Sequence, residues 1–381
     1  MLTRLSTLKL QLLAIGLSLM AGLSAQAATT VANAPVAASA PAPSGTPPRL
    51  TLKGPNILDP SGQPIILRGW SWGHWEQIVP QDAAENVAQG ANVVRIPLRW
   101  WGKYRTARID SRDEKATDSA LVSPANLKFL DEAMRNASNA KLWIVLFIDS
   151  DCGQNGTQPD GLKYCDPDGK YGAKGHNFWT DPAMRKQYIA VWRFIANRYK
   201  NTPYLAMFEP LPEINPPGVP APEIKALYAE LMSNIREVAP GVPFLIGGRH
   251  YQTGAMEEVY DPAWKDVIYT GNLFLHAKKR GADDASIDNF RKRAKQIVDF
   301  RERHQVPVFV QQIGVKSQDD PSKRGVKEMM KVMVDTKLGF AWWTYRGAGN
   351  PHEFSVVYPE RGQWVFKRDW LDEISWAFKH K

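Results

Sequence analysis

The sequence predicts an α/β protein, a single-domain (β/α)8 barrel of the TIM type. Short apolar segments alternate with amphipathic helical patterns over about 300 residues, as in such barrels. The apolar segments are rich in Val, Ile and Phe and almost continuous, which is typical of parallel strands covered on both faces. A doubly wound sheet is the less favoured alternative. It would usually show a Gly-rich phosphate-binding turn after its first strand, where this chain has RGWSWGHWE.

Eight apolar segments are expected to form the barrel strands. In chain order they cover residues 65–69, 92–98, 142–149, 204–209, 243–248, 267–274, 306–312 and 339–345. Side chains that act on a ligand are expected at the carboxyl ends of these strands, because that end of a TIM barrel carries the active site.

Helices are expected between the strands, where apolar residues recur at spacings of three and four. These patterns cover residues 126–137, 182–199, 223–238 and 286–304. Helix starts are expected at Ser123 or Asn126, at Asp181 and at Pro222.

The amino-terminal 27 residues have the features of a secretory signal peptide. Arg4 and Lys9 precede the apolar stretch LQLLAIGLSLMAGL, and Ala25-Gln26-Ala27 fits a cleavage site. The apolar stretch is short for a membrane span, which needs about 20 residues. We therefore expect a cleaved signal, a periplasmic or secreted protein, and no membrane span after cleavage.

The segment 28–48 is rich in Ala, Pro, Ser and Thr and has no aromatic residue. Such a composition cannot form a core, so we expect a disordered linker. The remaining residues, 49–381, contain no further Pro/Ser tract and are expected to form the barrel.

The chain is basic, with a formal net charge of +9, and loss of Arg4 and Lys9 with the signal leaves +7. Basic runs at 278–280 and 291–293 fit solvated helix faces or attraction to an anionic polymer. Nucleic acid is not an expected partner.

Cys152 and Cys165 are the two cysteines of the chain, and we expect a disulfide between them in an oxidising compartment. No His lies at ligand spacing beside them, so neither a metal nor a cofactor is expected.

Five segments together resemble glycoside hydrolase family 5, the cellulase-like retaining enzymes. They are ILRGWSWG, NVVRIPLRW, MFEPLPEI, VFVQQIGV and GFAWWTYRG, which resemble the family's first, second, fourth, seventh and eighth strands. The resemblance runs from about Leu50 to Trp376. It implies a β-linked polysaccharide or oligosaccharide of the β-glucan or mannan type as the ligand.

The resemblance implies roles for several residues. Glu213 matches the catalytic acid/base, and Arg95 matches the arginine that helps to hold the carboxylates. Trp343 matches the sugar-stacking tryptophan. Trp100 and His250 follow predicted strands and are further candidates for substrate binding. Six tryptophans lie at or after strand ends, where sugar stacking competes with core packing as an explanation: Trp70, Trp72, Trp75, Trp100, Trp101 and Trp343.

The chain also departs from the family pattern. Pro212 replaces the Asn before the acid/base, and Asn272 and Phe274 replace the His and Tyr of the sixth strand. Asp149 stands near the place of a missing His after the third strand. The nucleophile position carries Gln312.

Gln312 is the departure with the largest chemical consequence. Retaining hydrolysis needs two carboxyl groups about 5 Å apart. A glutamine amide has nearly the shape of a glutamate but no charge, so it is a poor nucleophile and cannot stabilise an oxocarbenium ion. Glu209 is expected to be structural, buried and paired with Arg95. Asp149, Glu209 or a substrate acetamide remains a possible replacement for the nucleophile.

Three functions are therefore open. The chain is a polysaccharide-binding barrel with lost or much reduced hydrolysis, an active hydrolase with an atypical second catalytic group, or a basic surface protein that binds exopolysaccharide without catalysis. Fold resemblance alone does not separate them.

Overall fold

The computed structural model describes the chain in ranges with gaps. They are residues 47–73, 78–99, 122, 124–149, 179, 182–216, 218–276, 281–316, 320, 323–347 and 354–380. The predicted signal peptide, nearly all of the predicted linker, Trp100, and the predicted Cys152–Cys165 disulfide lie outside these residues.

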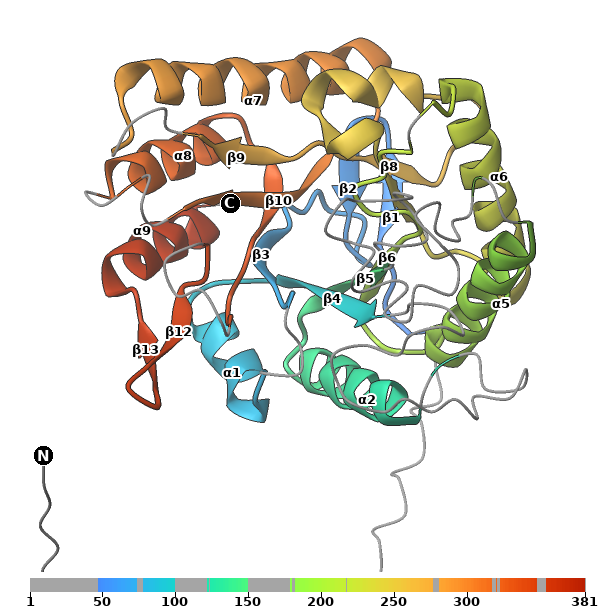
Figure 1. Cartoon of the computed structure of the whole chain (residues 1–381), viewed down its shortest axis with the longest axis horizontal. Coiled ribbons are helices and arrows are strands. Elements are labelled where there is room, and N and C mark those ends of the chain that lie inside the picture. The colour runs from blue at the N-terminus through green and yellow to red at the C-terminus, as the bar shows by residue number, and fades with distance from the viewer. Residues whose placement is uncertain are drawn as a thin grey trace, which may run out of the picture. The chain divides into compact units, whose positions relative to one another are not determined.

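A parallel sheet closes into the predicted barrel, with helices around it (Figure 1). Its strands in chain order are β3 (Arg68–Ser71), β4 (Val93–Arg99), β5 (Trp143–Asp149), β6 (Leu205–Glu209), β7 (Phe244–Ile246), β8 (Val267–Tyr269), β9 (Leu273–Leu275), β10 (Phe309–Val315) and β11 (Gly339–Trp342).

The strands β8 and β9 are two parts of the sixth barrel strand. Tyr269 in β8 pairs with Val308, just before β10, and Leu273 in β9 pairs with Ile313 inside β10. Because β8 also pairs with β7, these contacts close the ring. The predicted (β/α)8 class is confirmed.

The helices lie outside the barrel (Figure 1). They are α1 (Pro80–Ala88), α2 (Pro124–Asn139), α5 (Pro182–Tyr199), α6 (Ala221–Val238), α7 (Asp284–His304), α8 (Arg324–Asp335) and α9 (Arg368–Lys379). Two 3₁₀ helices, η3 (Arg249–Tyr251) and η4 (Thr253–Glu258), follow β7. The four helical patterns found in the sequence coincide with α2, α5, α6 and α7, whereas α1, α8 and α9 were not predicted.

The seventh barrel strand begins later than the sequence predicted. The expected segment was 306–312, whereas β10 covers Phe309–Val315. Pro307 has no N–H for the ladder, and its carbonyl accepts a hydrogen bond from the Tyr269 N–H at 3.0 Å. The shift matters because it places the polar pair at 311–312 inside the strand, not at its end.

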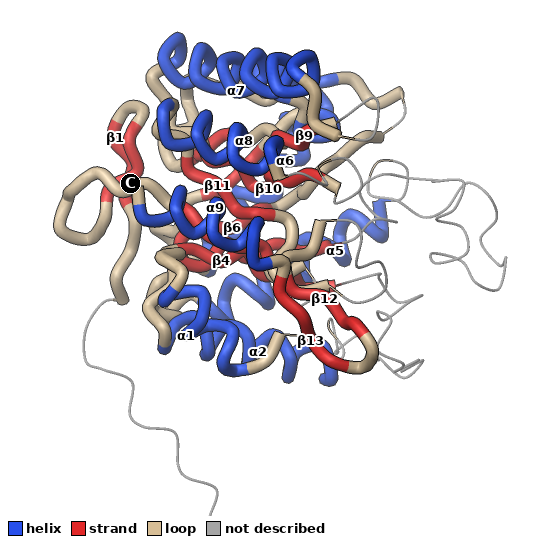
Figure 2. Tube along the Cα trace, turned by 90° about the vertical axis from the view of Figure 1, so that its left-hand side faces the viewer, coloured by secondary structure: helices blue, strands red, loops and turns tan. Residues whose placement is uncertain are grey.

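An apolar cluster fills the amino end of the barrel. It includes Val93 and Trp143, the first residues of their strands, together with Leu50 and Ile57 from the amino-terminal segment. Figure 2 shows the hairpin of β1 (Thr51–Lys53) and β2 (Asn56–Leu58) at one end of the barrel. This hairpin covers the amino end, so the described polar residues of the site lie toward the carboxyl end.

A second hairpin, β12 (Val357–Glu360) and β13 (Gln363–Phe366), precedes α9. The buried Arg68 guanidinium joins the helices near the carboxyl terminus to the barrel. It donates to the carbonyls of Met333 (2.7 Å) and Ala377 (2.9 Å), and burial lowers its pKa to about 10. In the part of the chain that the structure describes, no helix is both long and apolar enough to cross a membrane.

Candidate functional site

The interior of the barrel above the apolar cluster contains an ion pair. Arg95 on β4 donates to both carboxylate oxygens of Glu209 on β6, from Nε at 2.6 Å and from Nη2 at 2.9 Å. Both side chains are fully buried, and the guanidinium lies 3.5 Å from the ring centre of Phe147. Glu209 is therefore fully engaged by a structural partner.

The segment that follows Glu209 is held by aromatic side chains from three neighbouring elements. Its sequence, Pro-Leu-Pro-Glu, lacks two backbone N–H groups, so its carbonyls need donors from elsewhere. The donors to the carbonyls of residues 210 and 211 are the Tyr188 hydroxyl (2.7 Å), the Trp192 indole (3.2 Å), the Tyr228 hydroxyl (3.1 Å) and the Tyr251 hydroxyl (2.6 Å). Burial raises the pKa of Tyr228 and Tyr251, so both hydroxyls keep their protons and remain donors.

Glu213 lies at the end of this segment in a left-handed backbone conformation, with φ of 49°. Few residues with a side chain adopt this region, and they need support from their surroundings. Besides the aromatic donors, the His250 N–H donates to the carbonyl of Ile214 at 2.7 Å. The turn thus presents a partly buried carboxylate at a defined position in the barrel mouth.

A chain of side-chain amides leads to Glu213. The Gln311 amide nitrogen donates to Oδ1 of Asn272, and the Asn272 amide nitrogen donates to Oε1 of Glu213. Asn272 and Gln311 are almost completely buried. An amide N–H can only donate, so the chain supplies a hydrogen-bond donor to this carboxylate.

Gln312 lies beside this chain. In the pairing of β9 with β10, Leu273 faces Ile313, so the preceding residues, Asn272 and Gln312, are neighbours on adjacent strands. The pairing of β10 with β11 shifts register between Val310 and Ile313, as in a β-bulge. Gln312 is 5% exposed, and it places a neutral amide where the family resemblance implies a nucleophilic carboxylate.

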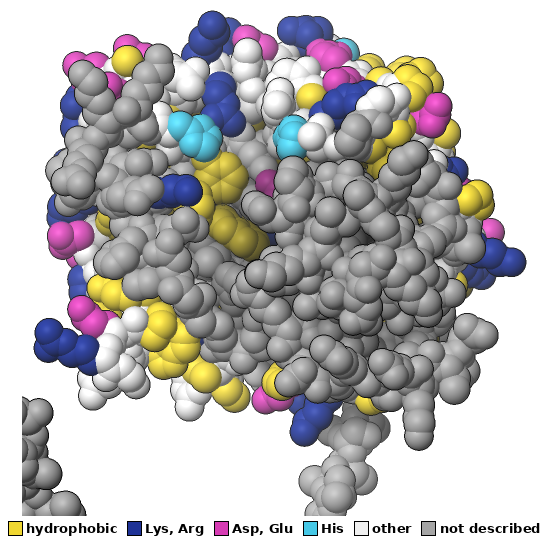
Figure 3. Space-filling model, in the orientation of Figure 1, with side chains coloured by type: hydrophobic (Ala, Val, Ile, Leu, Met, Phe, Trp, Pro, Cys, Tyr) yellow, Lys and Arg dark blue, Asp and Glu magenta, His cyan; other side chains and the backbone are white. Residues whose placement is uncertain are grey.

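Aromatic side chains border the mouth. Phe274 and Phe354 pack with ring centres 5.2 Å apart, and Trp343 is partly exposed at the end of β11. A Cβ on Gly73 would lie 2.4 Å from the Trp343 ring, so the missing side chain lets this indole pack closely on β3. Figure 3 shows a hollow with hydrophobic side chains at its base and histidine and cationic side chains on its rim.

The remaining predicted site residues are placed only in part. Asp149 ends β5, but its side chain lies outside the described part of the chain, as does Trp100. The His250 side chain is exposed, and this residue contributes through its backbone. Among the described residues, no cluster of His, Cys, Asp or Glu could hold a metal ion.

Two tryptophans that were candidates for sugar stacking are core residues instead. Trp70 and Trp72 are fully buried. Their indole nitrogens donate to side chains on or next to α1, Gln89 at 2.8 Å and Asn86 at 2.9 Å. Their position at a strand end therefore reflects packing between β3 and α1.

Other buried carboxylates near the strand ends have structural roles. Asp82 on α1 pairs with Arg346, with Nε to Oδ2 at 2.9 Å. Asp320 accepts from the N–H groups of Gly325 (2.9 Å) and Val326 (2.8 Å) at the start of α8. Neither carboxylate is placed to replace the one missing at position 312.

Sequence reasoning missed Gln311 and the tyrosines that hold the Glu213 turn. Gln311 stands next to Gln312, and two adjacent polar residues inside an apolar strand indicate that both have a polar role. Tyr228 lies in a regular helical pattern. Its spacing fits a buried core residue equally well whether or not its hydroxyl donates a hydrogen bond.

The sequence matches the Cellulase family (glycosyl hydrolase family 5) over residues 58–349. Endoglucanase C of Acetivibrio thermocellus is 22% identical over 335 residues, covering 74% of this chain and 90% of that protein. Endoglucanase C307 of Clostridium sp. (strain F1) has the same identity and coverage.

Solved structures resemble the barrel. An endogalactoceramidase superimposes with a TM-score of 0.66 at 16% identity, covering 86% of this chain and 84% of that chain. Endoglucanase Cel5A from Thermotoga maritima superimposes with a TM-score of 0.60 at 19% identity, covering 81% and 96%. At these identities the structural likeness supports the fold.

Proposed function

Because the chain belongs to glycosyl hydrolase family 5, the cellulase family, we propose that it is an exported protein that binds a β-linked polysaccharide and has lost most or all retaining hydrolysis. The signal-like leader at residues 1–27 supports export. The relatives named endoglucanases support a β-glucan, with mannan as a second polymer to test. The observation that carries the loss of hydrolysis is the neutral Gln312 beside Asn272.

Two consequences follow from the neutral amide. The glycosyl-enzyme intermediate cannot form, because the amide oxygen of Gln312 is a poor nucleophile. A neutral residue at 312 also does not supply the negative charge that would raise the pKa of an acid beside it, and Glu213 accepts a hydrogen bond from Asn272. Loss of both functions should lower turnover by several powers of ten.

Glu209 is a poor substitute for the missing nucleophile. Both of its oxygens are bound by Arg95, and its side chain has no exposed surface. Moving it toward a substrate would leave the Arg95 charge buried without its partner, at a cost of about 3–5 kcal/mol. An inverting reaction with Asp149 as base, and a reaction assisted by a substrate acetamide, are the alternatives that the experiment must separate.

Sugar binding does not require a nucleophilic carboxylate at position 312. Trp343, Phe274 and Phe354 offer apolar ring faces to sugar rings, and Glu213 offers an acceptor for hydroxyl groups. We therefore expect binding to persist where hydrolysis does not.

The test measures binding and cleavage on the same ligands. Calorimetry with cellohexaose and mannohexaose gives the affinity of the purified mature protein, and release of reducing ends from the matching polymers gives the turnover. Clear binding with negligible turnover supports the proposal. Robust turnover that disappears in Glu213→Gln but persists in Gln312→Ala contradicts it and points to Asp149 or to the substrate. Absence of binding to either ligand favours the surface-protein alternative.

A further inference from the structure

Next to the Gln312 position, two phenylalanines form a floor at the mouth. Phe274 on β9 and Phe354 meet edge to face, with ring centres 5.2 Å apart, and both are partly exposed. Gly314 makes this approach possible. A Cβ at that position would lie 3.1 Å from Phe354 and 3.3 Å from Phe274. The floor therefore lies over the strand that carries Gln312, two residues further along.

A lysine and a histidine lie beside this floor. The Lys316 ammonium lies 5.8 Å from the ring centre of Phe354. On the other side, the exposed His276 ring lies 6.3 Å from the ring of Phe274. Cations are attracted to the faces of aromatic rings, so the two phenylalanines favour a positive charge beside them.

A second cation, Arg293, lies against the backbone of β9. The Arg293 guanidinium on α7 donates to the carbonyls of Asn272 (2.6 Å) and Phe274 (3.0 Å). Among the described residues it forms no ion pair with a carboxylate, and burial lowers its pKa. Its positive charge is therefore not cancelled locally and adds to the potential on this side of the mouth.

The charge in the mouth is thus divided. The carboxylate of Glu213 is held on the β6 side by Asn272, whereas Lys316, His276 and Arg293 surround the phenylalanine floor. A neutral glycan can accept hydrogen bonds from these side chains, but it gains little from their positive charge. A sugar that carries an anionic group uses both the floor and the edge.

We propose that the floor of Phe274 and Phe354 is a subsite for an acidic sugar of a β-linked polysaccharide. The sugar ring lies on the aromatic faces, and its carboxylate faces Lys316 and His276. This inference rests on the proposed function and specifies the substrate class of the same cleft. The carboxylate belongs on the unit over the floor, because a unit at Gln312 would bring it toward Glu213.

The experiment compares two hexasaccharides with the same β-1,4-glucan backbone. One is cellohexaose, and in the other a single glucose carries a carboxylate at C6. A charge-assisted hydrogen bond to the carboxylate strengthens binding of the acidic ligand. We expect the acidic ligand to bind the mature protein about tenfold more tightly at low ionic strength. The difference should shrink in high salt, because salt screens exposed charges.

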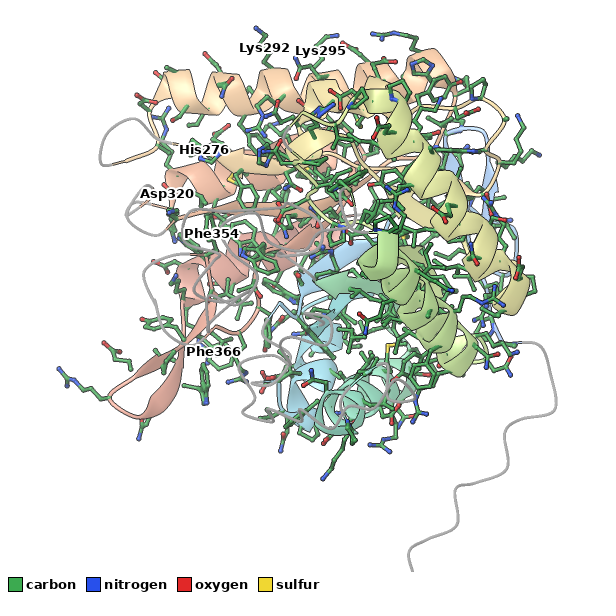
Figure 4. The ribbon with its side chains drawn as sticks, turned by 45° about the vertical axis from the view of Figure 1, so that its right-hand side comes forward. His276, Lys292, Lys295, Asp320, Phe354 and Phe366 are labelled. Carbon is green, nitrogen blue, oxygen red and sulfur yellow. The ribbon has the colours of Figure 1, made fainter. Side chains whose placement is uncertain are left out.

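Variants identify the source of the preference. Lys316→Gln should lower the affinity for the acidic ligand to that for cellohexaose, and Lys316→Arg should preserve the preference. Lys292→Gln is the matched control, because Lys292 is exposed on α7 and projects away from His276 and Phe354 (Figure 4). It removes the same charge from the protein and should leave the preference unchanged. Melting temperatures show that each variant is folded.

The outcomes separate this inference from the proposed function. Equal affinity for the two ligands, or a preference that survives Lys316→Gln, would overturn the acidic subsite while leaving glycan binding intact. Failure of both ligands to bind would overturn the proposed function and the subsite with it. If Lys316→Gln does not fold, His276→Gln and the salt dependence of the wild type test the subsite instead. A preference for the acidic ligand that neither the substitution nor high salt reduces is evidence against the subsite.

Discussion

Glu209 and Glu213 lie four residues apart on one segment, but their carboxylates differ in burial and in hydrogen-bond partners. Glu209 has both oxygens bound by the guanidinium of Arg95 and has no exposed surface. Glu213 is partly exposed, and its Oε1 accepts a hydrogen bond from the neutral amide of Asn272. The first charge is neutralised inside the fold, whereas the second carboxylate lies at the rim with part of its surface exposed.

This difference arises where the chain leaves the sheet. The last residue of β6 points into the closed interior, and the next residues turn over the rim of the barrel, held by tyrosine and tryptophan donors. A carboxylate inside the ring needs a cation to compensate its desolvation, whereas one at the rim keeps contact with solvent. The comparison predicts that a substitution of Glu209 lowers the stability of the fold. Substitutions around Glu213 should instead weaken ligand binding.

The largest expected effect is on stability. Glu209→Gln should lower the free energy of unfolding by about 3–5 kcal/mol, because it leaves the buried charge of Arg95 without its partner. Urea unfolding monitored by circular dichroism measures the change. Lys295→Gln, which breaks the exposed pair with Asp299, is the control and should cost less than about 1 kcal/mol. The double variant Arg95→Met/Glu209→Leu should be more stable than Glu209→Gln. A cost for Glu209→Gln as small as the control's would contradict a structural role for the pair.

The next effect is on binding. Trp343→Ala should reduce the affinity for cellohexaose by about tenfold, since it removes an aromatic face at the mouth. Trp376→Ala is the control, because Trp376 is 39% exposed on α9, outside the barrel. Titration calorimetry measures both variants. Unchanged affinity in Trp343→Ala would place the sugar elsewhere.

A smaller effect is expected from the amide chain. Asn272→Ala and Gln311→Met should each weaken binding by about threefold, because each loses a hydrogen bond that orients Glu213. The double variant should bind about as well as the weaker single variant, since both act through the same contact. Asn234→Ala on α6 serves as a surface control. Additive losses would show that Gln311 does not act through Asn272.

The smallest effect is expected from restoring the carboxylate. Gln312→Glu alone should raise reducing-end release by less than about tenfold, because Pro212 offers no contact to the sugar 2-hydroxyl, which supplies several kcal/mol in such sites. The double variant Gln312→Glu/Pro212→Asn should release more. Strong hydrolysis by Gln312→Glu alone would mean that the rest of the site is still intact.

The sequence by itself determined the barrel and the chemical character of its catalytic positions. Continuous apolar segments bounded by helical patterns leave few folds open, and the identities of Glu213 and Gln312 do not depend on packing. The bounds of the seventh strand were wrong because they depend on its neighbours, and residues 313–315 extend it by pairing with β9.

Only the tertiary structure decided which polar groups meet. Gln311 and Asn272 are 39 residues apart in the chain, and Arg95 and Glu209 are 114 apart. The pairing of β9 with β10 brings the first pair into contact, and the inward alternation of β4 and β6 brings the second. Such contacts depend on register and on side-chain direction across the ring. A linear pattern specifies neither, because the same residue types at the same spacing also fit a core or a solvent face. The separation of a neutralised, buried carboxylate from one at the rim is therefore a property of the closed barrel.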